Sequence, residues 1–370
     1  MFKKSFLLMA ICLALLMVFS LAGCDQPEDA EPDDTAEPDD EAPDETPDEV
    51  FELVVHDPTT AAGYTAVFER WVELVEERSD GRVQIEIMWG APLGGYADQA
   101  ENLQAGTFDA GRIMMSYIPG QMPLWQISGL NMLTDSMYAH YKGLEAVAEM
   151  PEAQAEVDQF DVQILFPLAS SRFELLSTQP IRTLDDFSGM DVRAYDYWAD
   201  VLEDLGAVPM PVPFPEVYSH LERAAVDAVT VPYPDFMTSN HFHEVTDYAI
   251  VTGGQGFSTG LFCITNDTWN TLPEDIQQIM LDAGPDAQQY YFEQHRQDAI
   301  DALEIFEEYG VEVIYLSDED QATLREMSQV YWQEWIDENE AQGIPAQQAL
   351  DIYLEAAEVA EAEDPIDYPY

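Results

Sequence analysis

Residues 51–87 contain FELVV (51–55), AVFERWVELVEER (66–78), the turn sequence SDG (79–81) and VQIEI (83–87). The first and last of these pieces are rich in β-branched and apolar residues, which is typical of strands. The second piece repeats apolar residues at helical spacing, on a face formed by Val67, Trp71, Leu74 and Val75. A strand, a helix and a strand in this order predict a parallel sheet covered by helices, and therefore an α/β fold.

The same alternation continues along the chain. We predict further strands at 111–115, 162–166, 191–194, 226–231 and 311–316, and further helices at 96–105, 198–205, 276–309, 318–339 and 350–363. The helix at 276–309 is expected to be interrupted near Gly284-Pro285. About 320 residues follow position 50, a length that favours two α/β lobes with a cleft outside the strand ends.

The first 23 residues have the pattern of an export signal. Lys3 and Lys4 precede an apolar run, residues 6–19, that is shorter than the roughly 18–20 residues of a membrane-spanning helix. The run leads into LAGC (21–24), which resembles the lipobox of bacterial lipoproteins and implies a lipid anchor on Cys24. The alternative is an uncleaved membrane anchor. Both readings place the rest of the chain outside the cytoplasm, at the cell surface or in the periplasm.

The stretch that follows Cys24 is acidic and rich in proline. Residues 25–49 hold 14 acidic residues, five prolines and no lysine or arginine. Such a segment repels itself and has little to bury, so residues 24–50 are predicted to be a disordered tether. A calcium-binding tract is the alternative, although the spacing matches no EF-hand loop.

The net charge of the whole chain is −60, and residues 51–370 carry 59 acidic against 11 basic residues. Self-repulsion of this size destabilises a compact state in dilute salt and favours a protein adapted to a saline exterior. Nucleic acid and anionic lipid surfaces are excluded as partners, because the chain has no basic patch for their phosphates. A calcium-rich environment or a cationic ligand remains the competing explanation.

The sequence offers little for catalysis. Cys263 is the one cysteine outside the export region, and its apolar surroundings (260–264) predict a buried strand residue. There is no G-x-S-x-G elbow and no P-loop, so we expect neither an enzyme nor a cofactor. His241, His243 and Glu244 lie close together in the sequence. We expect no metal there, because zinc needs three or four converging ligands and only two histidines on one face of a strand or loop are offered.

The central part of the chain carries a series of ordered motifs. These are SRFELLS (171–177), PIRTLDDFSGMDVR (180–193), LGAVPMPVPFPEVY (205–218) and AVD (225–227), with supporting matches at 79–83, 93–95, 106–109, 119–124 and 266–273. Together they resemble the solute receptors of TRAP transporters, the DctP-like family. The resemblance implies a two-lobed periplasmic-binding-protein-like fold with a ligand cleft between the lobes and a long helix spanning them. It also implies capture of a small organic acid for TRAP membrane permease subunits.

The resemblance assigns boundaries to the two lobes. The first lobe is expected at 51–169 plus about 259–300, and the second at 170–258 plus about 301–345. Residues 346–370 then form a C-terminal helix and tail.

The resemblance also assigns ligand contacts. Arg193 falls on the arginine that clamps the ligand carboxylate, a role suited to its planar, bidentate guanidinium. The alternative is a surface arginine paired with one of the many acids. Arg172 matches a second arginine of the family less closely, because Ser170 replaces a frequent glycine. Phe214 matches an aromatic residue that packs on the ligand, with a core phenylalanine as the alternative.

One position departs from the family pattern. Where the family often has an asparagine that binds the ligand, this chain has Val231, which predicts a more apolar pocket and puts a sialic acid or a plain dicarboxylate in doubt. Tyr233 and Asp235 are candidate replacements for the lost polar contact. His56 follows the first strand, where open sheets place ligand contacts, and is a further candidate.

Three other functions stay open. One is a receptor for an ATP-driven importer, which neighbouring permease genes would distinguish from the TRAP type. Another is a secreted enzyme on a similar α/β scaffold. The last is a sensory ligand-binding domain, although no transmembrane or signalling segment follows.

Overall fold

The computed structural model describes residues 49–59, 65–118 and 120–363, which belong to one compact unit, Asp48–Tyr370. Its strands are β1 (Phe51–Asp57), β2 (Val83–Trp89), β3 (Ala110–Ile113), β4 (Val162–Ser177), β5 (Asp191–Arg193), β6 (Val208–Met210), β7 (Ala228–Pro232), β8 (Tyr248–Val251), β9 (Phe257–Thr265) and β10 (Glu312–Tyr315). Its helices are α1 (Ala66–Arg78), α2 (Gln99–Gln104), α3 (Met137–Ala148), α4 (Pro151–Asp158), α5 (Asp196–Asp204), α6 (Val217–Glu222), α7 (Asp235–Ser239), α8 (Asn266–Trp269), α9 (Glu274–Tyr309), α10 (Asp318–Glu340) and α11 (Ala346–Glu363).

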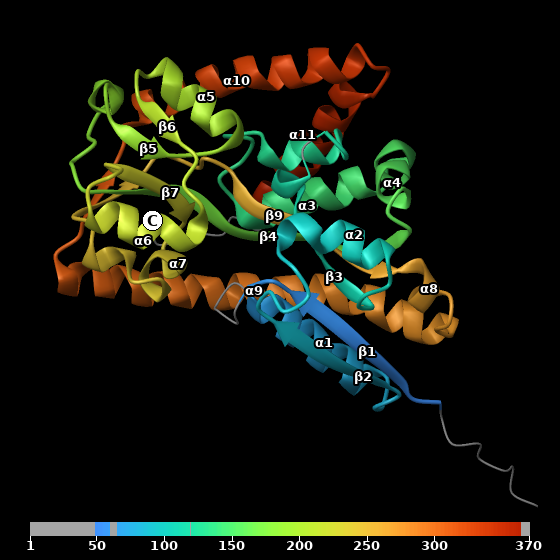
Figure 1. Cartoon of the computed structure of the whole chain (residues 1–370). Coiled ribbons are helices and arrows are strands. Elements are labelled where there is room, and N and C mark those ends of the chain that lie inside the picture. The colour runs from blue at the N-terminus through green and yellow to red at the C-terminus, as the bar shows by residue number, and fades with distance from the viewer. Residues whose placement is uncertain (1–48, 60–64, 119, 364–370) are drawn as a thin grey trace, which may run out of the picture. The chain divides into compact units, whose positions relative to one another are not determined.

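Two sheets share the long strand β4 (Figure 1). Its first part pairs with β9, which continues through β3 and β1 to β2 and completes the first sheet. Its last part, Phe173–Ser177, pairs with β7 and β8 in the second sheet, which also contains β5, β6 and β10. The pairing between β4 and β9 shifts register twice, the second time between Ala169 and Arg172, just before β4 enters the second sheet. Such irregularities bend a strand and increase its twist.

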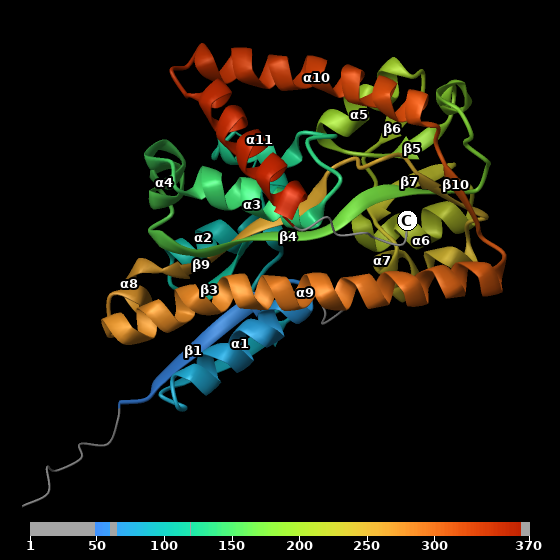
Figure 2. The same ribbon diagram turned by 180° about the vertical axis from the view of Figure 1, so that it is seen from behind.

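Two long helices, α9 and α10, each pack against both sheets (Figure 2). Helix α9 buries residues near its start, such as Ile276 and Met280, in the core of the first sheet and Phe306 in a core cluster of the second. Helix α10 buries Leu324 with the second sheet and Trp335 with the first. The predicted α/β class and the predicted spanning helix are therefore confirmed.

The predicted interruption at Gly284-Pro285 is wrong, since α9 is one helix of 36 residues that includes Pro285. Gly284 allows the helix to lie directly on Phe166, because a Cβ at this position would stand 2.5 Å from Phe166 Cδ1. Packing along both ends holds the helix together although Pro285 lacks the N–H for one helical hydrogen bond.

Cys263 lies in β9 opposite Gly111 and is fully buried, as predicted. Burial raises the pKa of its thiol, so the thiolate is disfavoured. No helix in the described ranges is both long and apolar enough to cross a membrane. The export signal, Cys24 and most of the acidic tether lie outside the described residues.

Candidate ligand-binding site

A cavity of about 670 Å³ lies where the first and second sheets meet. One wall comes from loops after β3 and from the 3₁₀ turn Trp125–Gly129. The opposite wall comes from β5, β7 and the segments that follow β5 and β6, while β4 and the β8–β9 connection supply the base. The lining residues are Met114, Met115, Ser116, Tyr117, Gln126, Ser128, Gly129, Asn131, Phe173, Arg193, Tyr195, Trp198, Pro211, Pro213, Phe214, Thr230, Gln255, Gly256, Phe257 and Thr259.

The lining differs sharply in charge from the rest of the chain. Six of its members are aromatic, and Arg193 is the one charged residue among the described residues at the wall. No aspartate or glutamate belongs to this lining, although residues 51–370 contain 59 acidic residues. The cavity is therefore an aromatic chamber with a single positive charge.

Arg193 is the last residue of β5 and is 9% exposed. Its Nε donates to the Val212 carbonyl over 3.1 Å, and its Nη1 donates to the Thr230 carbonyl over 2.5 Å. The guanidinium also lies over the Tyr195 ring, 4.8 Å from its centroid. Burial lowers the pKa of Arg193, and Tyr195 and Tyr117 oppose the shift, but an arginine stays charged in proteins.

The acceptors around Arg193 are neutral. No acidic residue in the described part of the chain forms an ion pair with it. A buried cation is favourable only when an anion or several hydrogen bonds compensate for its lost hydration. The two carbonyl contacts hold the guanidinium in place and leave part of its fork of five N–H groups for an anionic guest.

Phe214 lines the same cavity and is half-buried. Its ring packs against Phe236, with centroids 5.1 Å apart, and against the edge of Phe242 at 5.9 Å. Arg193 and Phe214, which are both predicted ligand contacts, therefore line the same cavity.

Arg172 is not among the lining residues, although its neighbour Phe173 is. Its Nε lies 3.0 Å from Oε1 of Glu174, a carboxylate that is fully buried in β4. Its predicted contact with the ligand stays a prediction.

Val231 and Tyr233 are fully buried in the apolar core beneath the second sheet and do not line the cavity. Thr230 does line it, because successive residues of a strand point to opposite faces. The Thr230 hydroxyl therefore lies at the wall, one residue before Val231, the position at which the family often has its ligand-binding asparagine. Tyr233 packs against Phe306, with ring centroids 6.2 Å apart.

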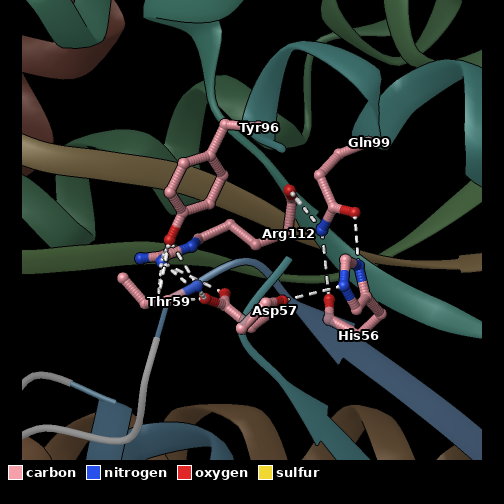
Figure 3. Close-up of polar contacts among 7 residues, drawn as sticks. His56, Asp57, Thr59, Tyr96, Gln99 and Arg112 are labelled. Atoms are coloured by element: carbon pink, nitrogen blue, oxygen red, sulfur yellow. Dashed lines mark hydrogen bonds and ion pairs between the residues drawn. The ribbon is translucent and has the colours of Figure 1, made fainter. Parts of the chain in front are cut away.

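His56 is also fully buried and lies away from the cavity lining, in a polar cluster of the first sheet (Figure 3). Its Nδ1 lies 2.8 Å from Gln99 Oε1, and its Nε2 lies 3.0 Å from the Gly90 carbonyl. In the same cluster the buried Arg112 pairs with Asp57 at 3.1 Å. These contacts give His56 a structural role in anchoring α2 and the end of β2.

One group of side chains in the described residues has the composition of a metal site, although the sequence predicts no metal. The ligand atoms of His241, His243 and Glu244 lie within 4.8 Å of one another, around a 3₁₀ turn at Phe242–Glu244. His241 and Glu244 are exposed, and His243 is buried. The absence of a metal at this turn stays a prediction.

Several cavity residues belong to no motif in the sequence, among them Tyr117, Asn131, Trp198 and Gln255. Trp198 was assigned to a helix by its periodicity, and it does belong to α5. Asn131 and Gln255 lie in connections between elements, where no periodicity marks the direction of a side chain.

A family model for bacterial extracellular solute-binding proteins, family 7 (DctP), matches residues 55–339 of this chain. The chain belongs to this family. The predicted resemblance to TRAP solute receptors is thereby confirmed. A solute-binding protein of Chromohalobacter salexigens is 26% identical over 239 residues, which are 63% of this chain and 69% of that protein.

Solved structures share the fold. A TRAP periplasmic solute-binding protein from Desulfovibrio salexigens with bound orotic acid has a TM-score of 0.71 and 23% identity, over 84% of this chain and 99% of that one. A TRAP solute-binding protein from Rhodoferax ferrireducens in complex with benzoate has a TM-score of 0.76 and 18% identity, over 85% and 99%. The two-lobed architecture of this family is therefore the architecture of this chain.

Proposed function

We propose that this chain captures a carboxylate-bearing organic molecule in the aromatic chamber and delivers it to a TRAP-type membrane permease. The observation that carries the proposal is Arg193, a buried cation at the cavity wall that donates to two carbonyl oxygens and has no acidic partner among the described residues. A ligand carboxylate would supply the missing negative charge and accept from the guanidinium fork. The chain would bind its ligand without chemical turnover.

The lining favours a flat or otherwise apolar acid. Tyr195, Trp198, Phe214 and Phe257 offer ring faces and edges, and the wall has a single positive charge, which suits a monocarboxylate. Two neighbours of the same fold hold orotic acid and benzoate, which are both ring carboxylates. The Thr230 hydroxyl at the wall would add a polar contact for the ligand one residue before Val231.

Closure of the two lobes around the ligand is part of this proposal. The chain crosses between the sheets within β4 and again between β8 and β9, where Gly253, Gly254 and Gly256 have positive φ angles. These two crossings support the proposal that the lobes divide near residues 169–170 and 258–259. A lipid anchor on Cys24 would keep the receptor at the membrane, and Cys24→Ala would release it into the soluble fraction.

The test is a thermal-shift screen of organic acids in concentrated salt, followed by calorimetry on Arg193→Ala with the acids that bind. Loss of a charge-assisted pair in a closed cleft is expected to weaken binding by about 2–5 kcal/mol. Arg193→Lys should bind with intermediate affinity, because lysine keeps the charge and loses the fork. Arg223→Ala, which changes an exposed arginine outside the lining, is the matched control.

Undiminished affinity in folded Arg193→Ala would exclude the role of Arg193. Turnover of a bound acid by the purified protein would favour the enzyme alternative instead. Genes for a small and a large permease subunit beside this gene would favour the TRAP type over an ATP-driven importer.

A further inference from the structure

Gln255 lies at the cavity wall in the connection between β8 and β9 and is 3% exposed. Asn131 connects the backbone of Gln255 to the backbone of α5. With its amide oxygen facing α5, Asn131 accepts from the backbone N–H of Trp198 over 2.8 Å and donates to the backbone carbonyl of Gln255 over 2.5 Å. The position of Gln255 is therefore fixed relative to α5.

A chain of hydrogen bonds sets the orientation of the Gln255 amide. The Glu174 carboxylate accepts from the Thr252 backbone N–H over 2.7 Å, from the Thr252 hydroxyl over 2.6 Å and from the Gly254 N–H over 3.2 Å. Arg172 forms an ion pair with the same carboxylate, with its Nε 3.0 Å from Oε1. Burial raises the pKa of Glu174, while Arg172, Thr252 and Gly254 oppose the shift. Three hydrogen-bond donors and one cation around the carboxylate fit its charged form.

The direction of each proton follows from these contacts. The Thr252 hydroxyl has a single hydrogen, and it is donated to Glu174. The Thr252 oxygen must therefore accept from Gln255 Nε2, which lies 3.2 Å away. The opposite end of the amide, Oε1, is then a pure acceptor whose orientation the network determines rather than leaves open.

Oε1 of Gln255 is buried and has no hydrogen-bond partner among the described residues. A buried acceptor without a donor is unfavourable, and proteins seldom keep one without a reason. Two more buried polar atoms of lining residues have no hydrogen-bond partner among the described residues, Nε1 of Trp198 and Oγ1 of Thr230. The chamber thus presents unsatisfied polar groups in addition to its cation.

We propose that Gln255 is a specificity-determining residue, whose Oε1 accepts a hydrogen bond from a hydroxyl or N–H group on the ligand. The inference rests on the proposed function, since the ligand carboxylate is assigned to Arg193. It narrows the substrate class to carboxylic acids that carry a second, neutral donor group. An acid without that donor would leave Oε1 unsatisfied in the closed cavity and would bind more weakly.

The test compares acids that differ by one donor. Calorimetry in concentrated salt would measure benzoate against 2-, 3- and 4-hydroxybenzoate and the matching methoxybenzoates, with propionate against lactate as an aliphatic set. At least one hydroxy acid is expected to bind about 10- to 100-fold more tightly than its parent acid, and its methyl ether should lose that advantage. In Gln255→Met, which has similar bulk and no amide, the ratio should fall towards one.

Two further variants keep the test sharp. Thr252→Val removes the hydroxyl that orients the amide, so the ratio should fall although Gln255 is still present. Gln289→Met changes an exposed glutamine outside the lining and should keep the ratio. Thermal melting identifies folded variants, and Gln255→Ala replaces Gln255→Met if that protein does not fold.

The outcomes separate the two proposals. If acids bind through Arg193 but no hydroxy acid is preferred, or the preference survives in Gln255→Met, the role of Gln255 is overturned and the proposed function stands. A bound water that satisfies Oε1 would give this result. If no carboxylic acid binds in the screen, the proposed function fails and the inference fails with it.

Discussion

At the scale of single residues, Glu156 predicts an unusual dependence of stability on pH. It lies in α4, and both of its carboxylate oxygens are 3.0 Å from the Leu124 backbone N–H. Burial raises the pKa of Glu156 to about 7, and the N–H groups of Leu124 and Trp125 oppose the shift. The folded protein therefore keeps a proton that the unfolded chain releases from about pH 4.5 upwards.

The free energy of unfolding should consequently fall as pH rises from about 4.5 to 7, and this contribution should be constant above that range. Glu156→Gln keeps an acceptor for Leu124 and does not titrate, so its stability should fall less over this range and exceed that of the wild type above pH 7. Urea unfolding in 1 M NaCl at several pH values measures the difference, with exposed Glu152→Gln as control. Parallel curves for Glu156→Gln and the wild type would contradict the assignment.

The sequence predicted cavity residues where a residue type is rare in the chain, and it did not predict them where strand register decides which side chain faces the cavity. An arginine in a segment with 59 acidic residues was informative, and Arg193 does line the cavity. Thr230 rather than Val231 faces the cavity because of the direction in which each face of β7 points. This direction is set by the pairing of β7 with β4 and β5. The sequence did not predict Gln255 as a site residue, because the orientation of its amide depends on contacts with Glu174, which lies 81 positions earlier in the chain.

At the scale of elements, the contact between α9 and β4 predicts the effect of Gly284→Ala. In an exposed helix this change would stabilise by about 1 kcal/mol. Here the new Cβ would stand 2.5 Å from Phe166 Cδ1, so crowding should exceed that gain and destabilise the protein by about 1–3 kcal/mol. Urea unfolding gives the magnitude.

Gly129→Ala is the control for this change, because a Cβ there would meet no atom within 4 Å. The double variant Gly284→Ala with Phe166→Leu should be less unstable than the sum of the single changes, since the smaller side chain makes room. A Gly284→Ala protein as stable as the wild type would show that the helix moves away from Phe166 without penalty.

Elements were predictable when one face stays in water. Helices α1 and α10 show such a polar face and were predicted at their observed places. Helix α3 was not predicted, because α11 covers it and most of its residues are buried, among them Met137, Tyr141 and Leu144. The second part of β4 was also missed, since the register shifts break the alternation by which a strand is recognised.

At the scale of the whole molecule, a net charge of −60 predicts that stability depends on salt. With ten arginines and three lysines in the chain, most carboxylates have no cation to pair with. Their mutual repulsion acts over a Debye length of about 10 Å at 0.1 M salt and about 3 Å at 1 M. The melting temperature should therefore rise between these concentrations, most steeply at the low end.

Binding of chloride to Arg193 would also raise the melting temperature with salt, because an anion that binds the native state stabilises it. The two causes separate in Arg193→Ala, which removes the cation of the chamber and leaves the surface charge almost unchanged. Screening predicts parallel curves of melting temperature against NaCl concentration for this variant and the wild type. A curve that flattens in Arg193→Ala would assign the effect to the cavity, and a melting temperature independent of salt in both proteins would show that repulsion among the carboxylates is already balanced within the fold.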